Sequence, residues 1–516
     1  MKRFEAMADS TPVIVGVGEF SEKAGDEGYM FRSPVALAAM AAKAALADTG
    51  VTRPLALEID VVAGIRQAEV SAPDAVAPFG CSNNFPRSVA KLIGADPARA
   101  VLEAVGGDGP QHLVNEFAAE ITAGRANLVL LVGAEALSSM RGMLSAGESA
   151  DWSESVSGSL EDRGYGPTFM DEAFARVTSA TPLNVFALLE NARRAKLGLG
   201  RAEYGLEMGR LFAPFTTIAA KNPHAFAPTV KSAAQLAEVS DRNRLTADPF
   251  PQAMVARNYV NQSAAVLMTS LAKARELGIN PSRMVFLHGR TDATDHQVQD
   301  RPDLSSSPAS VLAVSRAIEM SGLTLDAIDH LDLYSCFPVA VFNICDGLGI
   351  AATDTRALTV TGGLPFFGGP GNNYSMHAIA GIVRAARASP GSYGLVGANG
   401  GYLSKYSVGI YSTNVPDRLY PDNTDLAIEV GALPKVASDQ TPDGIGVVET
   451  YTIDHTVKPA KGIIVGRAES SGVRFIAGTT DIGTVNGMIS HDPIGADVVV
   501  ASDAETGPTI VSLSLK

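Results

Sequence analysis

Two short glycine-rich segments could hold a ligand through backbone amides. Gly106-Gly-Asp-Gly109 precedes a predicted helix that opens at Pro110, and Gly368-Gly-Pro-Gly371 precedes a second predicted helix. Free N–H groups at a helix start, with the positive end of the helix dipole, can hold a carbonyl or phosphate oxygen. One such segment indicates only a tight turn. Two favour a duplicated unit, with both turns on one side of a shared sheet.

The elements that must position these turns follow an alternating pattern. From Thr11 to about Leu137, short β-branched runs alternate with Ala-rich helical periods. The pattern resumes at Val260–Thr269 and repeats from Val311 to Tyr411. Such alternation is typical of βαβ units around a mostly parallel sheet. The sequence therefore predicts an α/β protein with two similar halves.

Two stretches depart from this pattern. Residues 138–247 are Ser-rich and acidic and then basic, and we interpret them as a domain inserted into an N-terminal half that spans 1–295. A C-terminal half spans 296–415. Residues 416–516 are β-rich with Gly, Asp and Pro turns, which predicts a small all-β domain, a barrel or sandwich.

The common motifs of hydrolases, nucleotide-binding proteins and metalloenzymes are missing. The sequence has no P-loop, no His-Glu-x-x-His, no Gly-x-Ser-x-Gly and no Cys-x-x-Cys. No carboxylates and histidines share metal-ligand spacing, so we expect no functional metal.

Five separated segments, in their order along the chain, resemble the thiolase superfamily, nearest its sterol-carrier-protein branch and the thiolase-like proteins with an added C-terminal domain. These segments are Val132–Leu137, Ala247–Phe250 with Asn258–Met268, Leu333–Pro338, Thr361–Tyr374 and Gly394–Gly401. The resemblance implies two βαβαβαββ halves in α-β-α-β-α layers, a loop domain over the ligand and an OB-like C-terminal domain. It also implies a coenzyme A thioester as ligand, no covalently bound cofactor, and the acetyl-CoA acetyltransferase activity of lipid and acyl-CoA metabolism.

The residues that catalyse thiolysis in this family are replaced here. By the resemblance, the nucleophilic cysteine falls on Gly106 and the histidine of Gly-His-Pro falls on Gly369. The polar residue that leads Asn-Glu-Ala-Phe falls on Tyr334, and the late cysteine of Cys-x-Gly falls on Ala398. Covalent acyl transfer needs a nucleophile and a base within hydrogen-bond reach, so we expect ordinary thiolase turnover to be lost or altered.

The resemblance leaves a ligand site made largely of backbone. Amides around Gly106, Gly107 and Gly400 are expected to polarise a thioester carbonyl. The loss of reactive side chains is expected to enlarge the pocket, which we expect to be lined by Gly369, Asn372, Asn373 and Tyr374. The two asparagines are also expected to cap the second helix, the usual role of asparagine at that place.

Three readings of the function stay open. Cys336 and His377 could form a substitute nucleophile and base, although a buried thiol and a core histidine are the plainer interpretation. Tyr334 and Tyr374 resemble the tyrosines with which thiolase-fold aldolases cleave carbon–carbon bonds, and residues 417–516 could then be a fused relative of the OB-fold partner of those aldolases. The third reading is a non-catalytic CoA-ligand-binding or assembly subunit.

Cations of the inserted domain are candidates for CoA phosphates, because arginine forks match phosphate geometry. A solvated helix face with acidic neighbours is an equal alternative. The candidates are Arg193, Arg194, Lys196, Arg201 and Arg210.

Charge and composition limit the partners. The formal net charge is −14, which disfavours nucleic-acid binding. The chain has three cysteines, no signal-peptide-like start and no apolar run long enough to span a bilayer. We expect a cytoplasmic protein without a membrane span; a monomer and a homodimer both remain open.

Overall fold

The structure is a computed structural model that describes residues 8–351, 354–416 and 424–515. Its first half runs strand, helix, strand, helix, strand, helix, strand, and a final strand follows a long insertion. These elements are β1 (Pro12–Ser21), α2 (Pro34–Asp48), β2 (Val61–Gly64), α3 (Phe85–Ile93), β3 (Arg99–Leu102), α4 (Gly109–Thr122), β4 (Leu128–Ala136) and β8 (Asn261–Ser270). The predicted βαβαβαββ order of this half is confirmed.

After α10 (Leu271–Glu276), the second half repeats this order with one strand missing among the described residues. Its elements are β9 (Val285–Thr294), α11 (Pro308–Ser321), β10 (His330–Leu333), α12 (Pro338–Leu348), α13 (Tyr374–Ala388), β11 (Tyr393–Gly400) and β12 (Lys405–Ser412). Residues 359–361 occupy the place that corresponds to β3 of the first half, but they form no strand. The buried carboxylate of Asp332 on β10 holds them instead and accepts hydrogen bonds from the amides of Val360 and Thr361.

The strands of both halves join in one sheet. In the described part of the chain it has ten strands in the order β10-β11-β12-β9-β1-β8-β4-β2-β3-β5, where β5 is Glu161–Asp162. β2 runs parallel to β3 and β4, while β8 is antiparallel to both β1 and β4. The halves meet where Val13 of β1 pairs with Phe286 of β9. The strand order is therefore mirrored about this junction, because the equivalent edge strands of two similar units pair with each other.

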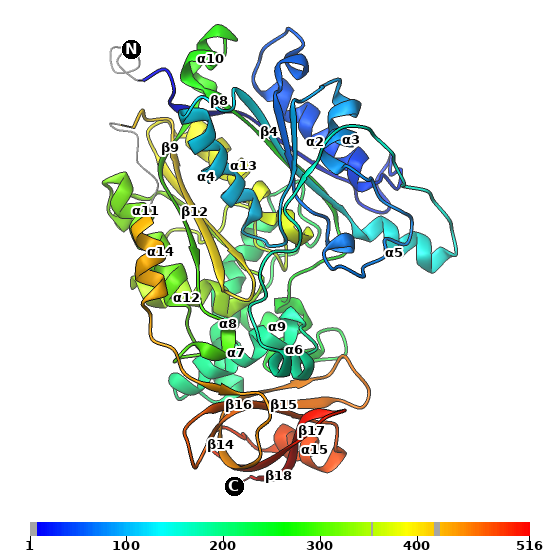
Figure 1. Ribbon diagram of the computed structural model, residues 1–516, viewed down its shortest axis with the longest axis vertical. Helices are drawn as coiled ribbons and strands as arrows, with labels where there is room; N and C mark the ends of the chain where they lie inside the picture. Colours follow the sequence, from blue (N-terminus) through cyan, green and yellow to red (C-terminus); the bar gives the residue numbers. More distant parts are fainter. Residues whose placement is uncertain (1–7, 352–353, 417–423, 516) are drawn as a thin grey trace.

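Helices from the two halves form the middle layer of the molecule. α4 and α13 contact each other and share one hydrophobic core with strands of both halves. α2 packs on β1 and β8 from the other side, and α11 packs on β9 and β12 (Figure 1). The strands of the two halves therefore form two β layers, one on each side of α4 and α13. This is the predicted α-β-α-β-α layering of the thiolase fold.

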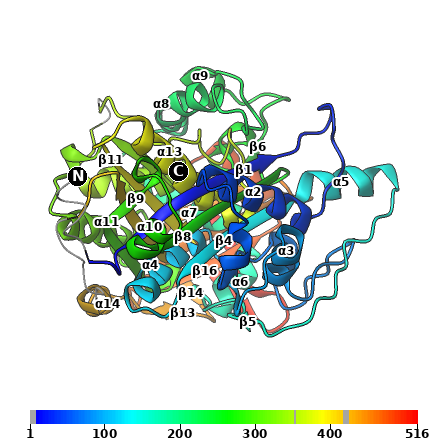
Figure 2. The same ribbon diagram turned by 90° about the horizontal axis from the view of Figure 1, so that it is seen from above.

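The segment between β4 and β8 is mainly helical. It contains α5 (Leu137–Ala146), α6 (Glu172–Thr178), α7 (Pro182–Lys196), α8 (Arg201–Ala219), α9 (Ala233–Ala237), β6 (Leu245–Ala247) and β7 (Phe250–Pro251). Viewed from above, α8 and α9 lie at one border of the molecule and α5 at another (Figure 2). α7 and α8 contact α12 and share its core, so the insertion is packed on the second half.

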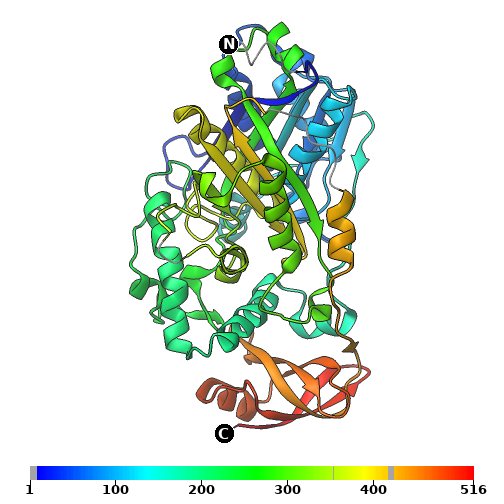
Figure 3. The same cartoon turned by 90° about the vertical axis from the view of Figure 1, so that its left-hand side faces the viewer.

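The chain ends in a small β-barrel at one extremity of the molecule (Figure 3). After α14 (Thr424–Gly431) and β13 (Ser438–Asp439) come β14 (Gly444–Asp454), β15 (Lys461–Ala468), β16 (Arg474–Thr479), α15 (Ile482–Ser490), β17 (Asp497–Asp503) and β18 (Gly507–Ser514). The pairings β14-β15-β16-β18-β17-β14 close a ring. A closed ring in this order is the OB-like barrel that the resemblance implies.

The barrel is joined to the insertion by sheet and side-chain contacts. Asp454 of β14 pairs with Ala247 of β6, and Thr450 donates a hydrogen bond to the carbonyl of Leu188 on α7 at 2.7 Å. Among the helices of residues 8–351, 354–416 and 424–515, none combines the length and apolarity that a membrane span needs.

Candidate functional site

The two glycine turns lie against each other. The amide of Gly106 donates to Oδ1 of Asn372 at 3.2 Å, and Ser375 Oγ donates to the carbonyl of Gly107 at 2.5 Å. Asn372 Nδ2 also donates to the carbonyl of Arg66, just beyond β2, at 2.9 Å. The expected meeting of the two turns is therefore present, at the carboxyl ends of β2 and β3.

The expected capping by the asparagines is wrong. Asn373 is the N-cap residue of α13, but its side chain makes no capping bond, and its side-chain oxygen and nitrogen are buried without a partner among the described residues. The side chain of Asn372 instead ties the second turn to the first through the Gly106 amide.

The space beside Gly106 is filled. A Cβ atom at this position would lie 2.5 Å from Lys405 Nζ and 2.2 Å from Asp108 Oδ1. Lys405, the first residue of β12, forms an ion pair with Asp108 at 3.0 Å and donates to the carbonyl of Val105 at 2.9 Å. The expectation of an enlarged pocket at Gly106 is therefore wrong, because a side chain from the other half occupies the space.

The space beside Gly107 and Gly400 is also filled. A Cβ at Gly107 would lie 2.2 Å from the Tyr334 hydroxyl, and one at Gly400 would lie 2.0 Å from Asp108 Oδ1. Glycine is required at these positions by close packing. Because the Gly106 amide is already donated to Asn372, it is also not a free donor for a thioester carbonyl.

Gly369 has more room than these three glycines. The nearest atom to a Cβ there would be Asn258 Oδ1, at 3.2 Å. The Gly369 amide donates to the carbonyl of Arg257 at 2.9 Å, so the second turn is fixed to the strand entrance of β8. Ala104, Val105, Gly371 and Asn372 are partly exposed, which leaves the junction of the turns open to solvent.

Tyr334 follows β10, and its hydroxyl faces the first turn. Its ring meets that of Tyr374 edge-on, with centroids 5.3 Å apart, and the residue is 7% exposed. Burial, with the nearby Cys336 and Asp108, raises the pKa of Tyr334 well above its ordinary value. The phenol is therefore a hydrogen-bond donor at neutral pH and not a base.

Tyr374 is closed off from any ligand. It is fully buried, and its hydroxyl makes hydrogen bonds with Thr361 Oγ1 at 2.6 Å and with Asp332 Oδ1 at 3.1 Å. Since Asp332 also holds the amides of residues 360 and 361, this network anchors the segment that replaces the missing strand. Tyr374 therefore stabilises the fold behind the site.

Cys336 and His377 have different partners. Asn399 Nδ2 lies 3.7 Å from Cys336 Sγ, and burial raises the pKa of this thiol to about 12. His377 Nδ1 lies 2.5 Å from Glu19 Oε1 on β1, and Glu19 also pairs with Arg384. The structure therefore does not pair the thiol with the imidazole.

The cations expected at CoA phosphates have other partners. Arg193 pairs with Asp346, Arg194 with Asp492 and Lys196 with Asp303, while Arg201 donates to the Tyr451 hydroxyl at 2.6 Å. Arg210 lies 3.5 Å from Glu207 on an exposed face. Asp492 and Tyr451 belong to the C-terminal part, so Arg194 and Arg201 dock the barrel. Neither the phosphate role nor a plain solvated face describes this pair.

A group with metal-ligand atoms borders the first glycine turn, but its carboxylates are already neutralised. Glu103, His112 and Glu116 lie together, and Arg163 donates to both carboxylates at 2.6 Å. Burial disfavours charge on His112, but its hydrogen bond with Asp292 raises its pKa to about 9. A protonated imidazole does not bind a metal, so the group is an ion-pair cluster.

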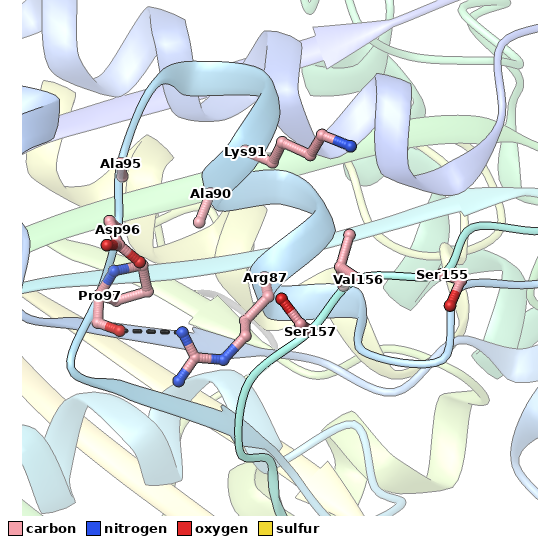
Figure 4. A pocket seen from close by; sticks show the side chains of 9 residues that line it. All are labelled: Arg87, Ala90, Lys91, Ala95, Asp96, Pro97, Ser155, Val156 and Ser157. Atoms are coloured by element: carbon pink, nitrogen blue, oxygen red, sulfur yellow. Dashed lines mark hydrogen bonds between the residues drawn. The ribbon is translucent and has the colours of Figure 1, made fainter.

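A surface hollow of about 450 Å³ lies between α3 and residues 155–157 (Figure 4). Arg87 lines it but donates to the carbonyl of Pro97 at 3.0 Å. Asp96 and Pro97 precede β3, whereas Gly106 follows β3, so this hollow lies at the opposite end of that strand from the glycine turns.

Lys405 and Asp108 are the site residues that sequence reasoning missed. Lys405 belongs to no recognised motif, and Asp108 lies inside the first glycine-rich segment, which indicated a role for its backbone alone. The available signal was the glycine at 106 itself, because a lost side chain in a packed interior must be replaced by another group.

Comparisons with known proteins agree with this architecture. A family model described as "Thiolase-like protein type 1 additional C-terminal domain" matches residues 425–505. A monomeric SCP2-thiolase-like protein type 1 from Mycobacterium smegmatis, known from its crystal structure, is 45% identical, with a TM-score of 0.84 over 98% of this chain and 99% of that chain.

Two further relatives are more distant. The dimeric peroxisomal thiolase of Saccharomyces cerevisiae is 15% identical, with a TM-score of 0.57 over 80% of this chain and all of that chain, which shows the shared fold. A probable acetyl-CoA acetyltransferase of Mycolicibacterium smegmatis is 29% identical over 126 residues. That match spans 24% of this chain and 30% of the relative, so this chain covers less than a third of the relative's length.

Proposed function

We propose that this chain, which belongs to the thiolase superfamily as a type 1 SCP2-thiolase-like protein, binds an acyl-CoA or related thioester where its two glycine turns meet. The observation that carries the proposal is the Gly106–Asn372 hydrogen bond, which joins the turns of the two halves at a junction that is partly open to solvent. Ligands of layered α/β proteins bind beyond the carboxyl ends of strands, where these turns lie.

We propose that the protein does not perform ordinary thiolysis. An acyl-enzyme needs an activated nucleophile, and the place of the family's cysteine side chain is taken by Lys405 and Asp108. The other buried thiol near the turns, Cys336, is held in its protonated form by burial. The binding of a thioester without acyl transfer is therefore the function that this geometry supports best.

The test is binding and chemistry measured on the same samples. Titration calorimetry with CoA, acetyl-CoA and octanoyl-CoA should show saturable binding of at least one thioester. Intact-mass analysis after incubation should show no acyl adduct, and acetoacetyl-CoA should not be thiolysed. An affinity no higher than that of an unrelated α/β protein would contradict the binding, and an acyl adduct would contradict the lack of transfer.

The retro-aldol alternative has less support from the site. Cleavage needs a base for the hydroxyl proton, and the phenols of Tyr334 and Tyr374 both have raised pKa values. Tyr374 is also fully buried. Tyr334→Phe would abolish cleavage if this alternative held.

We also propose that the chain acts as a cytoplasmic monomer in acyl-CoA metabolism. The 45% identical relative is described as monomeric. Native mass spectrometry of the full chain tests the oligomeric state, and a stable dimer at micromolar concentration would contradict it.

A further inference from the structure

Two side chains at the first glycine turn have hydrogen-bond donors to spare. Lys405 carries three N–H groups, of which one is donated to Val105 O at 2.9 Å, while Asp108 Oδ1 lies 3.0 Å from Nζ as its ion-pair partner. The hydroxyl of Tyr334 makes no hydrogen bond with any residue that the structure describes. Both side chains are largely but not completely covered: 15% of the Lys405 side chain and 7% of Tyr334 are exposed.

These two donors lie beside consecutive residues of one turn. Lys405 Nζ lies 2.5 Å from the position of a Cβ at Gly106, and the Tyr334 hydroxyl lies 2.2 Å from that of a Cβ at Gly107. Lys405 comes from the start of β12 and Tyr334 from the end of β10, both in the second half. The second half therefore supplies two polar groups to a turn of the first half.

A mostly buried donor without an acceptor costs free energy, so such donors indicate an acceptor that binds between them. The Lys405 charge is already balanced by Asp108, which favours a neutral oxygen over a second anion. A carbonyl oxygen suits both groups, because its two lone pairs can accept one bond from each.

We infer that Lys405 Nζ and the Tyr334 hydroxyl together bind the carbonyl oxygen of the thioester ligand. This inference rests on the proposed function and adds to it the groups that recognise the thioester. The Gly106 amide does not take part, because it is donated to Asn372. Asp108 acts as a positioning residue that fixes the ammonium of Lys405.

The consequence is a preference for ligands that carry the carbonyl. Octanoyl-CoA and its thioether S-octyl-CoA differ only in that oxygen. A charge-assisted hydrogen bond and a neutral one together should make the wild-type protein bind octanoyl-CoA at least about tenfold more tightly than the thioether.

Tyr334→Phe removes only the hydroxyl and is expected to reduce this preference several-fold. Tyr374→Phe is the matched control: it also removes a buried phenol oxygen, but one bonded to Thr361 and Asp332. The control is expected to lower the melting temperature and leave the octanoyl-to-octyl affinity ratio unchanged. A purely structural role for Tyr334 would give the control's result.

Lys405→Met is made in an Asp108→Asn background, because removal of the ammonium alone would leave a buried carboxylate without its partner. The octanoyl-to-octyl affinity ratio of the double variant should be about tenfold lower than that of Asp108→Asn. Equal binding of both ligands by the wild-type protein would overturn the inference and leave the proposed function standing. Binding of neither ligand would remove the proposed function and this inference with it.

Discussion

Lys405 and Asp108, which come from different halves of the duplicated fold, form a 3.0 Å ion pair in the space next to Gly106. Both side chains are mostly buried. The pair therefore links the halves at the position to which the resemblance assigns the family's nucleophile.

Restoring a side chain at residue 106 is expected to fail. Gly106→Cys would place Cβ within 2.5 Å of both Lys405 Nζ and Asp108 Oδ1, so the pair must move. We expect Gly106→Ala to lower the free energy of unfolding by about 1–3 kcal/mol, and Gly106→Cys to show no thiolysis. Urea unfolding and a thiolysis assay measure these outcomes.

Gly369→Ala is the matched control for this substitution. Its new Cβ would have no neighbour nearer than 3.2 Å, so a change under about 1 kcal/mol is expected. Equal costs at residues 106 and 369 would contradict the view that the ion pair fills the first site.

Stability should fall as the pH rises through the titration of Glu135. Burial raises the pKa of this carboxyl from 4.5 to about 8, despite a hydrogen bond from the Ala68 amide. Because the pKa is higher in the folded state, the contribution of Glu135 is fully present below about pH 4.5 and is lost as the pH rises through about 8.

Glu135→Gln removes this titration. Between about pH 5 and pH 9 the wild-type protein should lose on the order of a few kcal/mol that the variant retains. Chemical denaturation at a series of pH values measures the difference. The exposed Glu203→Gln serves as control, and parallel pH profiles for wild type and Glu135→Gln would contradict the prediction.

Docking of the barrel should depend on Arg474. This buried guanidinium contacts Glu449 at 2.6 Å and donates to the carbonyls of Gln299 and Pro302 in the body of the protein. Arg474→Ala leaves these two carbonyls without their donor, so the full chain should be destabilised by about 1–3 kcal/mol.

Arg467→Ala is the control for this effect. Arg467 also contacts Glu449, at 3.1 Å, but it is 31% exposed, and its bond to the Pro302 carbonyl is long, at 3.5 Å. We expect a cost of about 0–1 kcal/mol in urea unfolding. Similar costs for both variants would show that the carbonyl contacts of Arg474 add nothing.

The three cysteines should differ in reactivity. Burial raises the pKa of Cys336 and Cys345 to about 12; partial burial and Glu69 also raise the pKa of Cys81, but this residue is exposed to the reagent. Iodoacetamide reacts with thiolates, so Cys81 should be alkylated at least about tenfold faster than the others. Peptide mass spectrometry over time measures the rates, and early labelling of Cys336 would reopen its role as a nucleophile.

Local patterns predicted the elements well, but not the contents of the site. The helix expected at Pro110 spans Gly109–Thr122, and the β-rich C-terminal stretch forms the closed barrel. Hydrophobic periodicity and turn residues suffice for such elements. The filling of Gly106 depends on Lys405, nearly three hundred residues away, and on packing that no local pattern encodes.

The corrected roles have the same physical origin. The type and position of Asn372 predict a cap of α13, while the resemblance makes Arg194 and Arg201 candidates for CoA phosphates, with a solvated helix face as the equal alternative. Their partners are instead Gly106, Asp492 and Tyr451, all distant in sequence. Residue type correctly predicted that these side chains form hydrogen bonds or ion pairs. Which partner each one has depends on the tertiary structure.

The pairing of β14 with β6 makes the C-terminal barrel part of the same cooperative structure as the insertion. A chain cut before Thr424 would expose the edge of β6 at Ala247 and leave Arg194 without Asp492, so both strand edge and cation would face solvent at once. The gain of such a barrel during evolution, or its removal in the laboratory, therefore requires a redesigned surface on the insertion, and a shortened chain is expected to self-associate along that edge.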